Sequence, residues 1–122
     1  EYDAIDTFQG SKEHGIVIGL YEEAMANLKP LTDLGIVNVL QGHSQEVVSK
    51  YTDESLDFCF IDGSHEYEDV KEDILAYLPK VKSGGILAGH DYDPLWSGVV
   101  KAVNEILGKV EVINGSWIYY KP

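Results

Sequence analysis

Residues 58–70 read FCFIDGSHEYEDV, and this stretch decides the fold. Its first four residues form a continuous apolar run, which is typical of a strand buried on both faces of a parallel sheet. Asp62-Gly63-Ser64 ends the run abruptly. The pattern that follows, over residues 67–78, places apolar residues on one stripe and acidic residues on the other, as in an amphipathic helix. A strand, a tight turn and a helix in this order predict an α/β domain.

The same unit recurs along the chain. Strands are expected over residues 2–6, 36–40, 58–61 and 86–88, and a turn over 82–85 precedes the last of them. A loop over 7–15 leads to a helix over 18–28 that Pro30 interrupts; further helices begin at Ser44, near 67 and at Pro94. Asn114-Gly115 between two strand-like runs predicts a hairpin. The order predicts a Rossmann-like, doubly wound three-layer sandwich: a mostly parallel sheet with a C-terminal antiparallel hairpin.

Composition narrows the functional classes. The 122 residues, 44% of them hydrophobic and 25% charged, suit one domain spanning residues 1–122. A formal net charge of -12 disfavours nucleic acid and anionic membranes as partners, so the expected partner is a small-molecule substrate. Self-association into a homo-oligomer also stays open. The single cysteine, Cys59, allows no internal disulfide. Without a membrane-length apolar stretch or a signal-peptide pattern, a cytoplasmic location is expected.

The residues that end the strands are the candidates for function, because ligands of open α/β sheets bind beyond the carboxyl ends of the strands. These positions hold acids and histidines: Asp6, His43-Ser44, Asp62 with His65, and His90-Asp91. Asp also favours turns and helix caps, which explains single positions better than it explains the cluster.

Asp62 and Asp91 follow strands that we expect to be neighbours, about 4.8 Å apart. Their carboxylates could therefore converge on one Mg²⁺, Mn²⁺ or Ca²⁺ ion, and His90 as a third ligand would favour Mn²⁺ or another transition metal. In a metal-free alternative, each Asp caps the next helix and His90 packs inside. His65 has the chemistry of a general base, although it could merely hydrogen-bond a strand-end group.

Three motifs carry a resemblance to a known family: residues 60–67 (FIDGSHEY), residues 84–92 (GGILAGHDY) and Gly98-Val99-Val100 with Ala102-Val103. Together with residues 5–11 (IDTFQGS), they resemble the class I S-adenosylmethionine-dependent methyltransferases. More narrowly, the chain is similar to the small-molecule and sugar O-methyltransferases, of the cephalosporin hydroxylase-like and macrocin O-methyltransferase-like group. The resemblance covers essentially all 122 residues.

The resemblance implies a role for each strand end. Asp6 would bind the ribose of S-adenosylmethionine, His43 and Ser44 would border its adenine, and Asp62 would also adjoin the cofactor. Asp62, His90 and Asp91 match positions of a divalent cation, and His65 falls near a catalytic base. His65, Asp62 and Asp91 are thus the predicted catalytic residues, and the implied reaction is methyl transfer to an oxygen of a small molecule or sugar.

The chain departs from the family pattern at its start, where the family's first strand and glycine-rich loop have no counterpart. We therefore expect an N-terminally incomplete domain that binds S-adenosylmethionine weakly or not at all. Direct pairing of the strands that begin at Tyr2 and Leu56, or self-association, would close the sheet. Two other interpretations stay open. One is a truncated or non-catalytic binding domain; the other is a non-haem iron oxygenase that uses His65, His90 and a carboxylate.

Overall fold

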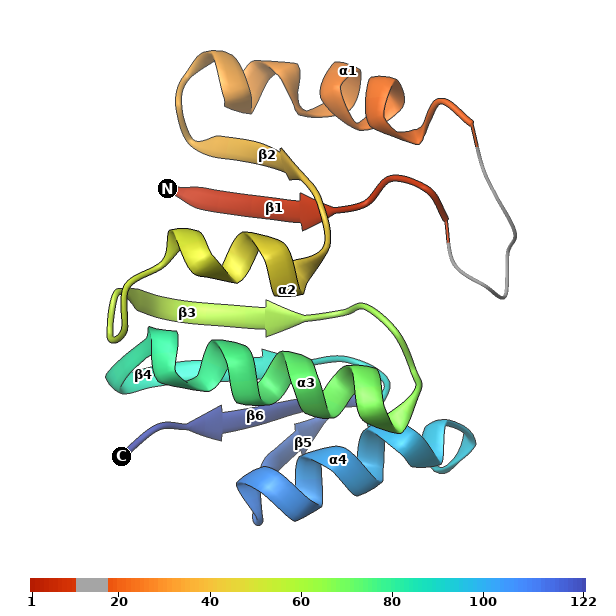
Figure 1. The fold of residues 1–122 in the computed structure, drawn as a ribbon, viewed down its shortest axis with the longest axis vertical. Coiled ribbons are helices and arrows are strands. Elements are labelled where there is room, and N and C mark those ends of the chain that lie inside the picture. The colour runs from red at the N-terminus through yellow and green to blue at the C-terminus, as the bar shows by residue number, and fades with distance from the viewer. Residues whose placement is uncertain (11–17) are drawn as a thin grey trace. The chain divides into compact units, whose positions relative to one another are not determined.

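The computed structural model describes residues 1–10 and 18–122 (Figure 1). The loop expected over 7–15 therefore lies partly outside the described residues. The chain divides into two compact units, a first unit of Glu1–Val47 and a second unit of Val48–Pro122. Strands and helices follow one another in the predicted order, which confirms the α/β class.

The first unit pairs two parallel strands, β1 (Tyr2–Asp6) and β2 (Val37–Gln41), in the register Asp6 opposite Gln41. Helix α1 (Leu20–Asp33) connects them, and the short helix α2 (Ser44–Val47) follows β2. Helix α2 begins at Ser44 itself, and the carbonyl of His43 accepts hydrogen bonds from the amides of Glu46 and Val47. Because both strands run in one direction, their carboxyl ends lie at the same edge.

Helix α1 runs through Pro30, so the predicted interruption is wrong. Proline has no backbone N–H to donate, yet the helix continues beyond it to Asp33. Lys29 Nζ lies 2.9 Å from Asp33 Oδ2, and the amide of Ile36 donates to the carbonyl of Leu31 beyond the helix end. The chain leaves the helix at Gly35, which adopts a left-handed φ of 68° just after the helix end.

The second unit contains a four-stranded sheet in the order β3-β4-β6-β5. Strand β3 (Leu56–Ile61) pairs parallel to β4 (Val81–Gly89), and β4 pairs antiparallel to β6 (Ser116–Tyr120), which in turn pairs with β5 (Glu111–Ile113). Asn114 and Gly115, with φ of 49° and 78°, form the tight turn of the predicted hairpin. The parallel pair with its closing hairpin is the predicted topology.

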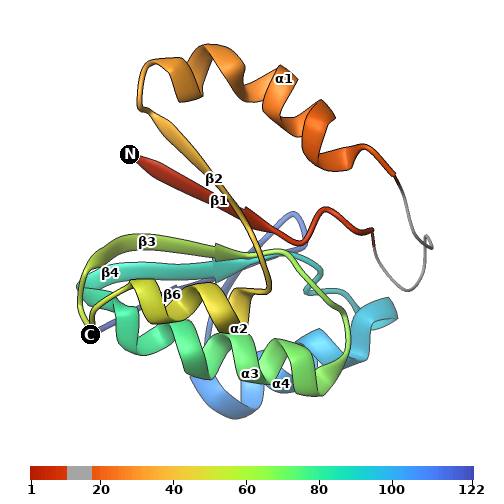
Figure 2. The same cartoon turned by 45° about the horizontal axis from the view of Figure 1, so that its top comes forward.

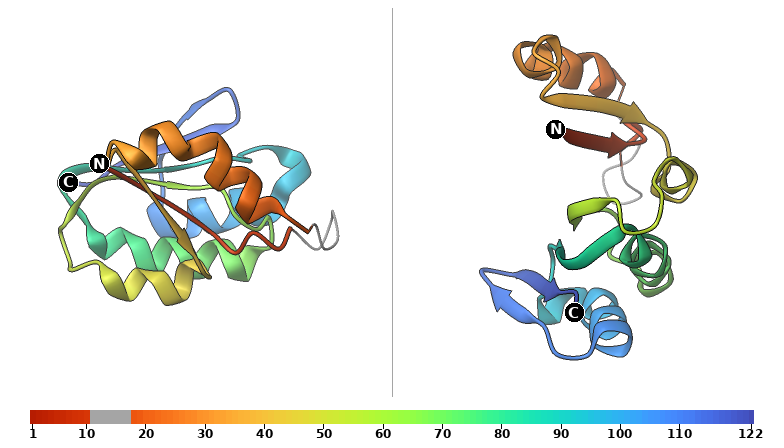
Figure 3. Two further views of the ribbon diagram at one scale, coloured as in Figure 1. Left: turned by 90° about the horizontal axis from the view of Figure 1, so that it is seen from above. Right: turned by 90° about the vertical axis from the view of Figure 1, so that its left-hand side faces the viewer.

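Helices α3 (Tyr67–Tyr77) and α4 (Ser97–Leu107) lie on the same side of this sheet (Figures 2 and 3). Short 3₁₀ turns η1 (Val48–Lys50), η2 (Leu78–Lys80) and η3 (Pro94–Trp96) complete the unit. The core lies between the helices and the sheet, where Ile74, Leu87, Val103 and Trp117 are almost fully buried.

Two local expectations differ from the structure. Phe58 and Phe60 are about half exposed (50% and 46%), so β3 is not buried on both faces as its apolar run predicts. Residues 82–85, expected as a turn, belong to β4, where the register with β3 shifts between Leu56 and Phe58. Gly84 and Gly85 lie where the register shifts, and Gly84 adopts a left-handed φ of 79° that a glycine accommodates without strain.

The described strands form a two-stranded sheet within the first unit and a four-stranded sheet within the second. Direct pairing of β1 with β3 would join the two units, and it stays a prediction. Within residues 1–10 and 18–122, no helix has the length and apolarity that crossing a membrane requires.

Candidate functional site

The carboxyl ends of β3 and β4 bring the central candidates together. Ile61 and Gly89 are direct partners in the parallel ladder, and the amide of His90 donates to the carbonyl of Ile61 over 3.1 Å. Asp62 and His90 therefore leave adjacent strands at the same height, and Asp91 follows. This is the neighbouring-strand arrangement that the sequence predicts.

Gly89 lets the end of β4 lie close to both β3 and the side chain of Trp117. A Cβ atom at this position would lie 2.5 Å from Cζ2 of Trp117 and 2.6 Å from the carbonyl oxygen of Ile61. Trp117 is only 1% exposed, so neither neighbour can move aside easily. The glycine thus lets the end of β4 lie between β3 and the buried indole, and it sets the position of His90-Asp91.

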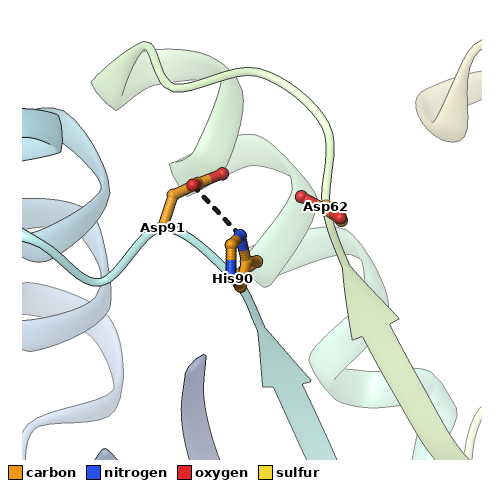
Figure 4. A group of neighbouring side chains, drawn as sticks. All are labelled: Asp62, His90 and Asp91. Carbon is orange, nitrogen blue, oxygen red and sulfur yellow. Dashed lines mark ion pairs between the residues drawn. The ribbon is translucent and has the colours of Figure 1, made fainter. Parts of the chain in front are cut away.

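Asp62, His90 and Asp91 form a cluster whose potential ligand atoms all lie within 4.8 Å of one another (Figure 4). Asp62 and His90 are exposed, whereas Asp91 is partly buried. His90 Nδ1 lies 3.1 Å from Asp91 Oδ1. All three residues line a small pocket, which is also lined by the apolar side chains of Val70, Val99 and Trp117. Two carboxylates and an imidazole suit a hard or borderline divalent cation such as Mg²⁺ or Mn²⁺.

Asp91 also contacts His65, so its two oxygens have different partners. His65 Nε2 lies 3.0 Å from Asp91 Oδ2, while Oδ1 faces His90. Asp91 has a left-handed φ of 60°, an unusual backbone conformation for a residue other than glycine, and such strain is often found at functional sites. The structure thus places all three predicted catalytic residues, Asp62, His65 and Asp91, at one edge of the second unit.

The metal-free capping alternative is not supported by the helix termini. Glu66, not Asp62, occupies the N-cap position of α3, and the amide of Glu66 donates to Ser64 Oγ. Asp93, not Asp91, caps η3 by accepting the amide of Leu95 over 2.9 Å. The side chain of His90 is 47% exposed and is not packed inside. Asp62 and Asp91 are therefore not explained as caps of the helices that follow them.

The two-histidine arrangement of the iron oxygenase alternative is not formed either. Among the described residues, the cluster that could hold a metal combines one histidine, His90, with two carboxylates. His65 contacts Asp91 instead.

The predicted cofactor residues of the first unit lie at its own carboxyl edge. Asp6 ends β1, where its Oδ1 accepts the amide of Phe8 and its carbonyl accepts the amide of Gly42. His43 and Ser44 come directly after β2, next to Gly42 along the chain. Since Asp6 and Gln41 are ladder partners, the structure brings these three residues to one edge.

Sequence reasoning missed Trp96, and it named Gly98 in a motif without giving it a structural role. The indole of Trp96 stacks on the His65 imidazole, with ring centroids 3.9 Å apart and an angle of 24° between the planes. A Cβ on Gly98 would lie 2.6 Å from the carbonyl oxygen of His65. Gly98 belongs to the family-like motif Gly98-Val99-Val100, which could have drawn attention to it. A tryptophan near the start of a helix, by contrast, does not indicate a functional role by itself.

Burial raises the pKa of two side chains, Cys59 in β3 and Tyr77 in α3. Desolvation, helped by the charge of Asp73, raises the pKa of the Cys59 thiol to about 12. Burial likewise raises the pKa of Tyr77 to about 12, with smaller effects from Cys59 and Asp73. A neutral thiol is a poor nucleophile, so Cys59 is poorly suited to nucleophilic catalysis at neutral pH.

Comparison with known proteins matches these features to a family. A family model described as a methyltransferase domain matches residues 1–92, which include Asp62, His65, His90 and Asp91. The chain belongs to this methyltransferase family. This confirms the resemblance that the sequence motifs indicate. An uncharacterized protein of Sinorhizobium fredii, y4gI, is 31% identical over 90 residues, which are 72% of this chain and 10% of that protein.

Solved structures confirm the Rossmann-like methyltransferase fold. A Corynebacterium glutamicum protein matches 98% of this chain and 59% of its own, with a TM-score of 0.72 and 19% identity. The match to CalS11, a TDP-rhamnose 3′-O-methyltransferase of calicheamicin biosynthesis, covers 97% of this chain and 57% of CalS11, with a TM-score of 0.68 and 20% identity. The match to MycE, crystallised with Mg and SAH, covers 98% of this chain and 36% of MycE, with a TM-score of 0.57 and 15% identity. This methyltransferase domain thus spans less than two thirds of each.

Proposed function

We propose that this methyltransferase domain serves S-adenosylmethionine-dependent methyl transfer to an oxygen of a small molecule, a sugar among the candidates, with a divalent cation held by Asp62, His90 and Asp91. The observation that carries the proposal is the convergence of these three side chains, whose ligand atoms lie within 4.8 Å at the ends of β3 and β4. Similarity in fold to CalS11, whose name gives a sugar 3′-O-methyltransferase, supports the acceptor class.

The donor set fits the cation. Two carboxylates and one imidazole offer a mixed oxygen and nitrogen set that leaves positions for water and an acceptor oxygen. When bound, a divalent cation lowers the pKa of a coordinated hydroxyl and orients it for in-line attack on a methyl group. Similarity in fold to MycE, which was crystallised with Mg, is in keeping with this assignment.

His65 is the proposed base. His65 Nε2 lies 3.0 Å from Asp91 Oδ2, and this contact orients the imidazole. In the proposed role the imidazole takes the proton of the acceptor hydroxyl as the methyl group is transferred. Asp91 would thus have two roles, because one oxygen orients His65 and the other would help to hold the cation.

The first unit supplies the proposed nucleoside contacts. The carboxylate of Asp6 accepts hydrogen bonds from ribose hydroxyls, and His43 and Ser44 border the adenine. These assignments follow from the family resemblance and from the common edge at which the three residues lie.

A direct test combines cation binding with methyl transfer. Mn²⁺ binding, measured by the loss of the free Mn²⁺ signal in electron paramagnetic resonance, is expected for the protein and is expected to be abolished in Asp62→Asn. Asp57→Asn is the matched control, because Asp57 lies on the same strand and pairs with Lys82. In a protein that joins this domain to the family's first strand and glycine-rich loop, methyl transfer from S-adenosylmethionine to a panel of nucleotide sugars, followed by mass spectrometry, should require Mg²⁺ or Mn²⁺. Transfer that proceeds fully in EDTA would contradict the metal-assisted mechanism.

A further inference from the structure

The loop between β4 and η3 carries His90 and Asp91, and its backbone is anchored on both sides of Asp91. Before Asp91, the amide of His90 donates to the carbonyl of Ile61 in β3 over 3.1 Å. After it, the amide of Tyr92 donates to the carbonyl of Gly115 over 2.8 Å. Asp91 therefore lies between one anchor on the neighbouring strand and a second on the turn of the β5–β6 hairpin.

The side chain of Tyr92 provides a third anchor, on helix α4. Its hydroxyl donates to Oδ1 of Asn104 over 2.8 Å. Asn104 is held by its helix, which packs on the sheet through residues such as the fully buried Val103 next to it. Through Tyr92, the loop is thus joined to both the hairpin turn and α4, all within the second unit.

Asp91 needs these anchors because its backbone has a left-handed φ of 60°. A residue with a Cβ adopts this conformation at a cost, and it persists where the surrounding contacts impose it. The carboxylate of Asp91 lies beside His90, with Oδ1 3.1 Å from Nδ1 (Figure 4). A change in φ at Asp91 would turn this carboxylate away from Asp62 and His90. The geometry of the cluster therefore depends on what holds the next residue in the chain.

We propose that Tyr92 is a positioning residue, which holds the left-handed backbone of Asp91 through its bonds to Asn104 and to the hairpin turn and so keeps the carboxylate of Asp91 in the cluster. The inference rests on the proposed function in one respect, the role of Asp91 as a cation ligand. The anchoring of the loop itself follows from contacts within the second unit. Tyr92 acts through Asp91 and not on the acceptor.

Amide hydrogen exchange tests the anchoring without a metal or an acceptor. Loss of one hydrogen bond in Tyr92→Phe should raise the opening equilibrium of the loop, and with it the exchange rate of the Tyr92 amide, about fivefold. Tyr120→Phe is the control. It also removes a tyrosine hydroxyl, which donates to Glu111 over 3.1 Å at the end of β6 that is far from the hairpin turn. In this control, the Tyr92 amide should exchange as in the unaltered protein. An exchange rate that Tyr92→Phe leaves unchanged would overturn the proposal.

Mn²⁺ binding tests whether the anchored loop positions Asp91. The apparent affinity scales with the fraction of molecules whose loop is competent to bind, so Tyr92→Phe should bind Mn²⁺ about two- to fivefold more weakly. Tyr120→Phe should bind it as the unaltered protein does. A merely structural role would lower the Tm of the two variants alike and leave the affinity of the folded protein unchanged, and that result would refute the positioning role.

Asn104 allows the same test from the other partner if Tyr92→Phe does not fold. Asn104→Asp keeps an acceptor oxygen, so it is expected to retain slow exchange of the Tyr92 amide and the Mn²⁺ affinity. Asn104→Ala should behave as Tyr92→Phe does, and an Asn104→Ala variant that matches the unaltered protein in both would contradict the inference. Failure of the unaltered protein to bind Mn²⁺ contradicts the metal-assisted function, and the exchange rates then decide whether Tyr92 holds the loop.

Discussion

Substitution of Gly89 by alanine tests the packing that brings β3 and β4 together. The added methyl group would lie 2.5 Å from Cζ2 of Trp117 and 2.6 Å from the carbonyl of Ile61, and both neighbours are held in place. Overpacking of this kind costs about 1–3 kcal/mol. The lower conformational entropy of alanine in the unfolded chain returns about 0.4–1 kcal/mol, so a net loss of about 1–2 kcal/mol is expected. For a small domain this lowers Tm by roughly 4–16 °C.

Gly63→Ala is the matched control, because Gly63 lies just beyond the neighbouring strand. There the added methyl group would make only an ordinary contact, 3.7 Å from Asp73 Oδ2. Thermal unfolding followed by circular dichroism should therefore show Gly89→Ala melting well below the unaltered protein and Gly63→Ala close to it. A Gly89→Ala variant that melts at or above the unaltered protein would refute the close-approach argument.

Three further predictions concern titration. Because burial raises the pKa of Cys59 from 9.0 to about 12, its reaction with a disulfide reagent at pH 8 should be roughly a thousandfold slower in the folded than in the unfolded protein; equal rates would contradict this. Between pH 9 and 12 the unfolded thiol ionises while the folded one stays neutral, so the unfolded state binds fewer protons and stability falls as pH rises. In denaturant titrations, the free energy of unfolding of Cys59→Ala should fall less at alkaline pH than that of the unaltered protein. The fall that remains above pH 10 is expected to come from Tyr77, whose pKa is also raised by burial. Glu111→Gln should lower the pKa of Tyr120 in an ultraviolet titration, because the hydrogen bond to Glu111 and its charge raise that pKa; an unchanged titration would show that the contact is not made in solution.

Much of the fold follows from local sequence signals. Asp62-Gly63-Ser64 ends an apolar strand, Asp93-Pro94 begins a helical segment, and Asn114-Gly115 turns a hairpin, each for a reason of backbone chemistry. The failures have a different origin. Pro30 removes one donor from α1 and the rest of the helix tolerates it. The half exposure of Phe58 and Phe60 depends on what covers the sheet, which an apolar run does not specify.

The sequence predicts which residues lie at the candidate site, but it does not predict how their side chains contact one another. Parallel pairing of two strands that end in acids implies that Asp62 and Asp91 lie close together. The division of Asp91 between His65 and His90 depends on a left-handed φ of 60°, which no pattern in the sequence indicates. The stack of Trp96 on His65 joins the 3₁₀ turn η3 to the loop before α3, which a helix and a strand separate along the chain, so it emerges only from tertiary packing.

The central claim is that Asp62, His90 and Asp91 hold one divalent cation at the ends of β3 and β4. Its most direct measurement is the anomalous scattering of Mn²⁺ from crystals of the protein grown with the ion. The account predicts a single strong peak within ligand distance of all three side chains. A map with no peak there, or with the carboxylates of Asp62 and Asp91 directed apart, would contradict it.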